Sequence, residues 1–303
     1  MDTESKSTGE SGDSCPLCGG SGSTVFVVNG CRISDCGVCG HRFHWVADPV
    51  SHLSTVYDES YFTGGGAGYP NYLAEAELLR ARGAMYARKI VPYVGQPGKM
   101  LDIGAAAGCI LSGFIDEGWE GIGLEPNGGM IAAARDLYGL ELIEGTLESF
   151  ETDQRFDLVS AIQVAGHFYD PRMAFENAFE ILKTDGVLLI ETWNRESLLA
   201  RLFGENWHEY SPPSVVQWWS PESLCRFLAQ LGFDRIAGGR TVKKISGMHL
   251  RSLLDYKFGK RRLAGLIPER FAIPYPSEDL FWGLYRKRDE GPADRCLPKK
   301  TSE

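Results

Sequence analysis

Four cysteines near the N-terminus have the spacing of a metal site. Cys15 and Cys18 form one C-x2-C pair, Cys36 and Cys39 form a second, and seventeen residues separate the pairs. Thiolates at this spacing typically hold a tetrahedral zinc ion. Because four thiolates leave no open coordination position, we expect Zn2+ with a structural role.

The segment between the two pairs indicates a β-hairpin, since apolar runs flank Asn29-Gly30. A module of this size buries too little apolar surface to fold alone, so the metal would supply the missing stability. Paired disulfides and a redox dithiol are the alternatives to zinc. A cytoplasmic location disfavours the disulfides, and a redox dithiol would not need two pairs.

A glycine-rich turn follows an apolar strand in KMLDIGAAAGCILSGF. Asp102 ends the strand, and Gly104, Ala106 and Gly108 follow at alternate positions. A dinucleotide-binding turn starting at Gly104 would need glycine at positions 106 and 109, where the chain has alanine and cysteine. The sequence also contains no G-x-x-x-x-G-K-[ST] phosphate loop. The turn therefore suits a ligand without a pyrophosphate.

From Lys99 to Trp193 the chain resembles the class I S-adenosylmethionine-dependent methyltransferases. The acid and outer glycines of the turn carry the resemblance, together with a second acid, Glu125, at the end of the next strand in GIGLEP. In that family the second acid binds both ribose hydroxyls, and a carboxylate can accept two such hydrogen bonds. Many members have aspartate at the Thr146 position. The resemblance implies S-adenosyl-L-methionine as cofactor and a cofactor site of Asp102, Gly104, Ala105, Gly108, Glu125, Pro126, Thr146, Leu147 and Gln163.

Two histidines are candidate catalytic residues. Methyl transfer requires alignment of nucleophile, methyl and sulfur, and a hydroxyl or carbon acceptor also needs a base. His167, in AIQVAGHFYDP, is the first candidate and His208, in ENWHEY, the second. A structural role for His167 is the alternative, and members of the family often have glutamate where this chain has Gly166. The nearby VVQWWS indicates either an apolar acceptor pocket or a buried tryptophan pair.

Strands and helices alternate from Lys99 onward, which predicts a doubly wound, Rossmann-like parallel sheet in an α/β protein. We expect strands in KMLDIG, EGIGLEP, LELIEGT, FDLVSAIQV and DGVLLIETW, and a closing hairpin of FDRIAGG and DLFWGLYRKR. SPESLCRFLAQLGF should form a helix with Ser220 at its N-cap. Its capping box should be incomplete, since no glutamate follows at the third position.

These elements predict six segments. They are a disordered leader (1–13), a zinc-ribbon-like module (14–48), an aromatic linker with a helix (49–98), the S-adenosylmethionine-binding methyltransferase domain (99–240), a C-terminal excursion with a closing strand (241–288) and a flexible tail (289–303).

Charge is unevenly distributed along the chain. The net charge is −9, yet residues 240–288 contain twelve Lys/Arg against four Asp/Glu. The negative total disfavours nucleic acid as the main partner, whereas the basic segment either attracts an anionic or carrier-linked acceptor or is a solvated surface. SGMHLRSLLDYKFGKRRLAGL has helical apolar spacing that would suit a membrane surface, a lid or an oligomer contact.

The sequence contains no apolar run long enough to span a membrane, and its polar N-terminus does not resemble a signal peptide. We therefore expect a cytoplasmic protein.

The expected function is methylation of an oxygen or carbon atom of a small molecule. The zinc module, linker and C-terminal excursion together resemble methyltransferases of sugars, glycan precursors and natural products. An rRNA or tRNA methyltransferase with a zinc-ribbon RNA-binding module and a non-catalytic cofactor-binding protein are the alternatives. The sequence does not specify the acceptor or the oligomeric state.

Overall fold

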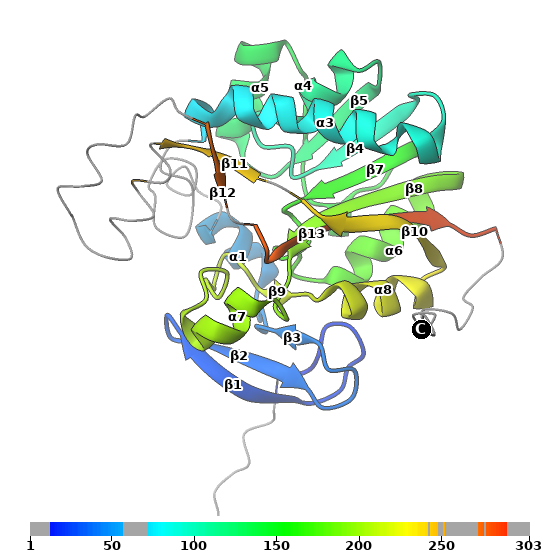
Figure 1. Ribbon diagram of the computed structural model, residues 1–303. Coiled ribbons are helices and arrows are strands. Elements are labelled where there is room, and N and C mark those ends of the chain that lie inside the picture. The colour runs from blue at the N-terminus through cyan, green and yellow to red at the C-terminus, as the bar shows by residue number, and fades with distance from the viewer. Residues whose placement is uncertain are drawn as a thin grey trace, which may run out of the picture.

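The computed structural model describes residues 13–56, 72–241, 243–247, 251, 272–275 and 277–289 (Figure 1). The predicted leader up to residue 12, the linker at 57–71, most of the amphipathic segment and the tail from residue 290 lie outside the described residues. Among the described helices, none has the length and apolar character needed to cross a membrane.

A seven-stranded sheet forms the centre of the molecule, in the order β10-β13-β8-β7-β4-β5-β6. The strands β4 to β8 that pair with one another are parallel, and β13 is antiparallel to both of its neighbours. The predicted α/β fold and closing hairpin are confirmed, although LELIEGT contributes only two strand residues. The strands are β4 Lys99–Ile103, β5 Glu120–Glu125, β6 Ile143–Glu144, β7 Phe156–Ile162, β8 Leu182–Trp193, β10 Phe233–Arg240 and β13 Leu280–Lys287.

Helices cover both faces of this sheet (Figure 1). One face carries α3 (Ala76–Val94), α4 (Cys109–Asp116) and α5 (Gly128–Tyr138), and the other carries α6 (Pro171–Ile181) and α8 (Pro221–Gln230). Successive side chains of β4 alternate between two cores: Met100 packs with the α3 and α4 residues, Leu101 with those of α6 and α8. Burial on both faces explains why these strands read as continuous apolar runs.

The N-terminus of α8 corrects one prediction. The Ser220 hydroxyl accepts a hydrogen bond from Ser223 N at 3.2 Å, and the Ser223 hydroxyl accepts one from Ser220 N at 2.9 Å. The capping box is therefore complete, and the prediction was wrong because serine can take the place of glutamate at the third position.

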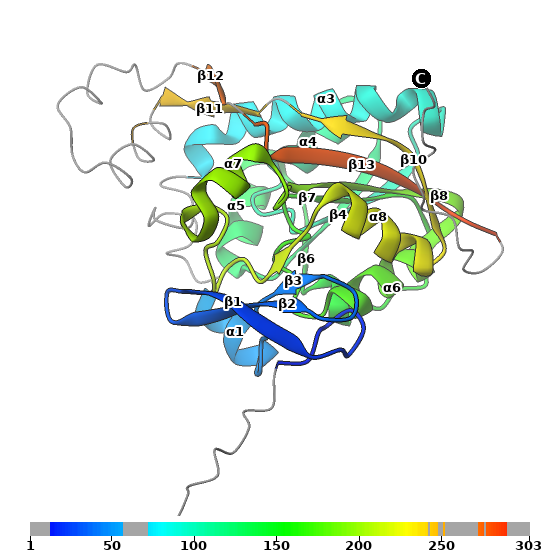
Figure 2. The same ribbon diagram turned by 60° about the horizontal axis from the view of Figure 1, so that its bottom comes forward.

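The N-terminal module forms a second sheet that includes a strand from the central region. β1 (Gly22–Val28) and β2 (Cys31–Cys36) make the predicted hairpin, with positive φ at both Asn29 and Gly30. β3 (Arg42–Phe43) then pairs with β9 (Gln217–Trp218), so that the order is β1-β2-β3-β9. Figure 2 shows this sheet beneath the central domain, with α1 (Pro49–Val56) beside it.

The remaining elements are short. α7 (Leu198–Phe203) contributes Ala200 to an apolar cluster with Ile33 of the module. β11 (Lys243–Ser246) and β12 (Ala272–Tyr275) pair antiparallel at the base of the C-terminal excursion. Three 3-10 turns complete the described elements: η1 Leu73–Glu75, η2 Leu147–Ser149 and η3 Gly204–Asn206.

Candidate functional site

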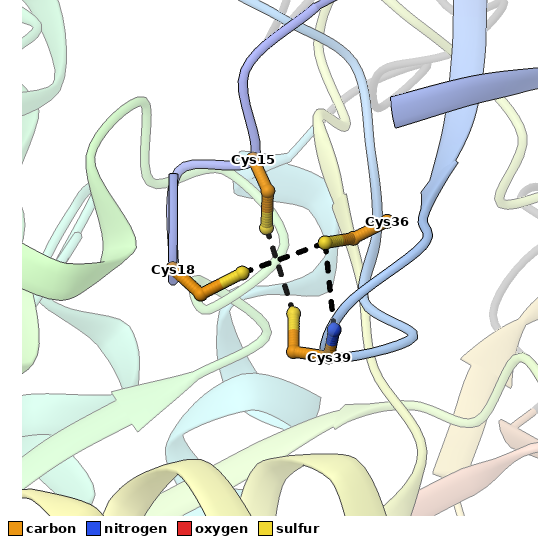
Figure 3. A group of neighbouring side chains, drawn as sticks. All are labelled: Cys15, Cys18, Cys36 and Cys39. Carbon is orange, nitrogen blue, oxygen red and sulfur yellow. Dashed lines mark hydrogen bonds between the residues drawn. The ribbon is translucent and has the colours of Figure 1, made fainter. Parts of the chain in front are cut away.

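The four cysteines converge at one end of the module (Figure 3). Cys15 Sγ lies 3.6 Å from Cys39 Sγ, Cys18 Sγ lies 3.4 Å from Cys36 Sγ, and all four sulfurs are within 4.8 Å of one another. Tetrahedral zinc, with Zn–S bonds of about 2.3 Å, separates neighbouring sulfurs by roughly 3.8 Å. The donor set and its spacing therefore fit the predicted ion.

Backbone N–H groups already point at this cluster. The amides of Val38 and Cys39 donate to Cys36 Sγ at 3.4 and 3.5 Å. Burial opposes ionisation of the Cys36 thiol, but these amides and the neighbouring thiols lower its pKa to about 7. Burial raises the pKa of Cys15 and Cys39. Because zinc binds thiolates, its binding would release protons from these residues.

A pocket opens at the carboxyl ends of β4, β5 and β7, where the strand order of the sheet reverses. Its wall contains nine of the eleven predicted cofactor and catalytic residues, namely Asp102, Gly104, Ala105, Glu125, Pro126, Thr146, Leu147, Gln163 and His167. Gly108 and His208 are the two that the described wall does not include.

The glycine turn places a backbone donor against the second acid. Gly104, Ala106 and Gly108 all have positive φ, of 61°, 47° and 70°. In this conformation Ala106 N donates to Glu125 Oε2 at 2.8 Å, and Asn127 N donates to Glu125 Oε1 at 2.9 Å. Gly108 forms the N-cap of α4, so it shapes the turn from outside the wall.

Asp102 and Glu125 are buried carboxyl groups in the pocket wall. Burial raises the pKa of each to about 7, although the Ser160 hydroxyl donates to Asp102 Oδ1 at 2.6 Å and backbone amides donate to Glu125. Within the described part of the chain, neither forms an ion pair. Two such carboxylates suit a ligand that carries hydroxyl donors and positive charge.

His167 lies in the wall in its neutral form. The Ser214 carbonyl can only accept, so the 2.7 Å contact with His167 Nδ1 places the proton on that nitrogen. Burial lowers the pKa of His167 to about 4, which keeps the imidazole uncharged at neutral pH. A side chain at Gly166 would begin 3.3 Å from Gln217 O and Val215 Cγ1. A side chain at position 166 would therefore require these neighbours to move by a few tenths of an ångström.

His208 is placed elsewhere. Its ring contacts Trp193 and Trp207, with ring centroids 4.7 and 5.6 Å away, and its Nδ1 lies 3.7 Å from an Asp279 carboxylate oxygen. The structure therefore does not bring His208 together with His167.

The two tryptophans of VVQWWS pack in the interior. Trp218 and Trp219 are both buried, and their indole N–H groups donate to the carbonyls of Glu209 and Ala165 at 2.7 and 2.9 Å. Neither belongs to the described pocket wall. Of the two interpretations of this motif, the buried pair is the one observed.

Several residues of the pocket wall were not predicted from the sequence. Arg82 of α3 lines the pocket and donates to both oxygens of Glu191, and no motif marked it. Leu53 comes from α1, which follows the module in the chain. Glu148, whose pKa burial raises to about 7, lies two residues after Thr146 in EGTLESF, so its proximity to a predicted residue was the available signal.

A curated protein matches about half of the chain. A Ubiquinone biosynthesis O-methyltransferase of Rhodopseudomonas palustris (strain BisB5) is 30% identical over 168 residues, which cover 52% of this chain and 64% of that protein. The chain thus spans slightly less than two thirds of the length of this curated relative.

Solved structures share the fold. A structure described as a methyltransferase from Bacillus halodurans C-125 has a TM-score of 0.51 at 17% identity, over 67% of this chain and 98% of that chain. A chain in the complex of the Haloferax volcanii Trm112 methyltransferase activator with a methyltransferase has a TM-score of 0.52 at 16% identity, over 71% and 94%. Residues 77–237, more than half of the chain, match the family model described as Methyltransferase domain, and the protein belongs to this family.

Proposed function

We propose that the protein transfers the methyl group of S-adenosyl-L-methionine to an oxygen or carbon atom of a small molecule. The observation that carries this proposal is one pocket in which two buried carboxyl groups, Asp102 and Glu125, meet the turn at 104–108. S-adenosyl-L-methionine carries ribose hydroxyls, an ammonium and a sulfonium. Its hydroxyl donors and positive charges therefore match the two buried carboxyl groups.

Six wall residues can be assigned to parts of the cofactor. Glu125 would accept from the ribose hydroxyls, because each of its oxygens accepts one amide hydrogen and a carboxylate oxygen has two lone pairs. Asp102 and Gln163 would face the amino-acid end, and Thr146 and Leu147 the adenine. Arg82 would supply a cation near the carboxylate of the methionine part.

His167 is the proposed base. When bound, S-adenosyl-L-methionine supplies an electrophilic methyl group whose leaving group is a neutral thioether. The protein must hold the acceptor in line with that methyl and remove the acceptor's proton. With its Nδ1 proton held by Ser214 O, neutral His167 would take the proton at Nε2. We assign this role to His167 rather than His208, since only His167 lies in the described wall.

The remaining wall favours a small apolar or aromatic acceptor. Leu53, Tyr72, Leu79, Phe168 and Tyr169 line the same pocket. The Rhodopseudomonas palustris relative is named for O-methylation, which favours a hydroxyl group over a carbon atom. The cysteine cluster would bind Zn2+ with a structural role, because four thiolates complete its coordination.

Calorimetry with matched variants tests the cofactor site. The wild type should bind S-adenosyl-L-methionine, whereas Glu125→Gln should weaken binding at least about tenfold, because it removes the charge and sets an amide NH2 against a backbone N–H. Glu120→Gln on the same strand, at an exposed position, is the control and should bind like the wild type. Absence of binding to the wild type would overturn the proposal.

A second experiment identifies the acceptor class. Labelled methyl transfer should appear in the small-molecule fraction of a cell extract, and label in RNA would instead support an RNA methyltransferase. His167→Ala should retain cofactor binding and lose most of this transfer. Cofactor binding without any labelled product would support a non-catalytic protein.

A further inference from the structure

The cysteine module and the His167 segment contact opposite sides of one short strand. On one side, β9 pairs with β3, which begins three residues after Cys39. On the other side, the amides of Val216 and Gln217 both donate to the Gly166 carbonyl, at 2.8 and 2.9 Å. Gly166 directly precedes His167, so a single strand lies between the proposed metal site and the proposed base.

The Gln217 side chain continues this connection. Its Oε1 lies 2.8 Å from His41 Nε2, and its Nε2 donates to the Phe168 carbonyl at 3.0 Å. Gln217 and His41 are 2% and 1% exposed, so water cannot replace either contact without a rearrangement. The His41 carbonyl in turn accepts from Cys36 N at 2.8 Å. Hydrogen bonds therefore run from a cysteine of the cluster to the residue after His167.

The segment before β9 supplies the last contact. Ser214 O accepts the Nδ1 proton of His167 at 2.7 Å, three residues before Gln217. Residues 166, 167 and 168 are thus each held by the 214–217 segment. The clearance around Gly166 is small, since a Cβ atom there would lie 3.3 Å from Gln217 O and from Val215 Cγ1.

We infer that Gln217 is a positioning residue, which couples the cysteine module to the His167 segment and so fixes the Nδ1-protonated form of His167. This inference rests on the proposed function for the role of His167 in catalysis, but not for its hydrogen bonds. Without the Gln217 side chain, the Phe168 carbonyl and the His41 ring would lose a buried partner, and the 166–168 segment would shift to find others.

The test uses Gln217→Met, which keeps the length of the side chain and removes its hydrogen bonds. The readout is the nitrogen NMR spectrum of the histidine rings in the full chain, prepared with zinc. In the wild type, His167 should show the Nδ1-protonated tautomer alone. In Gln217→Met it should show a mixture of tautomers, while the Kd for S-adenosylhomocysteine stays within about twofold.

The matched control is Arg172→Gln. Arg172 of α6 donates to the Leu17 carbonyl, so this change also cuts a contact between the module and the central domain, but one that does not reach residues 166–168. Arg172→Gln should leave the His167 signals as in the wild type. Equal changes in both variants would mean general loosening and would overturn the inference, as would an unchanged tautomer in Gln217→Met.

A second variant covers the case in which Gln217→Met does not fold. His41→Phe keeps a ring against Trp219, whose centroid lies 4.5 Å from that of His41, and removes the donor to Gln217. It should shift the His167 tautomer in the same way, and a wild-type signal would overturn the inference. A failure of the proposed function would appear separately, as a wild type that does not bind S-adenosyl-L-methionine.

Discussion

At the scale of single residues, Ala106 holds a backbone conformation that usually belongs to glycine. Its φ of 47° lies in the left-handed region, which costs an L-residue about 1–2 kcal/mol relative to glycine. The same conformation directs its N–H to Glu125, and its methyl group is buried beside Tyr72 and Leu79. The sequence indicated only an added methyl group, because the sign of φ is not visible in a residue type.

We expect Ala106→Gly to change little. Relief of the left-handed conformation is offset by the loss of a buried methyl, about 0.8 kcal/mol, and by the greater freedom of glycine in the unfolded chain, about 0.4–1 kcal/mol. The free energy of unfolding should stay within about 1 kcal/mol of the wild type. The Kd for S-adenosyl-L-methionine should stay within about twofold, since the N–H to Glu125 remains.

Gly104→Ala provides the contrast. Its φ is also positive, at 61°, and the new Cβ would lie 2.8 Å from Val164 Cγ2 in the pocket wall. We expect a loss of about 2 kcal/mol in the free energy of unfolding and at least tenfold weaker cofactor binding. Denaturant unfolding and calorimetry on both variants measure these effects, and a tenfold loss of affinity in Ala106→Gly would contradict the argument.

At the scale of elements, the long buried strands were predictable and the short contacts between distant segments were not. β4, β7 and the second half of β8 contain buried, largely apolar stretches of strand length. β9 has only two residues. It is defined as a strand by its pairing with β3, which lies more than 170 residues earlier in the sequence. Pairing at such separation leaves no local pattern, so the shared sheet and the Leu53 wall contact required the structure.

The metal cluster leads to a prediction at this scale. Cys36→Ser should abolish stoichiometric zinc binding and lower the free energy of unfolding by about 3 kcal/mol or more, since metal binding to such modules contributes about 10–16 kcal/mol. Because β3 and β9 share a sheet, the loss should extend to the central domain. Cys31→Ser is the control: Cys31 lies at the start of β2, outside the cluster, and one zinc per chain should remain. Metal analysis and thermal unfolding provide the measurements, and equal zinc content in both variants would refute the assignment.

At the scale of the whole molecule, three buried carboxyl groups line one pocket at the edge of the central sheet. That sheet has a hydrophobic core on each of its two faces. Asp102, Glu125 and Glu148 each have a pKa that burial raises to about 7. A raised pKa means that the folded state binds these protons more tightly than the unfolded state does. Their contribution to stability is complete below about pH 4 and is lost as the pH rises through about 7. Ionisation of these groups near neutral pH therefore lowers the free energy of unfolding, and a bound ligand with positive charge would offset that loss.

Glu148→Gln isolates one of these contributions. The amide oxygen can still accept from Tyr169 N, which lies 3.1 Å from Glu148 Oε1, but the group no longer titrates. Between pH 6.5 and 8 the cofactor-free wild type should lose on the order of 1 kcal/mol relative to the variant, because the carboxyl of Glu148 ionises in that window. Zinc release from thiolates also depends on pH, but that dependence is common to both proteins and cancels in the difference.

The control is Glu144→Gln, at an exposed position of β6, which should show no such trend. Denaturant unfolding at the two pH values measures the difference, and a difference that does not change with pH would show that Glu148 is already ionised at pH 6.5.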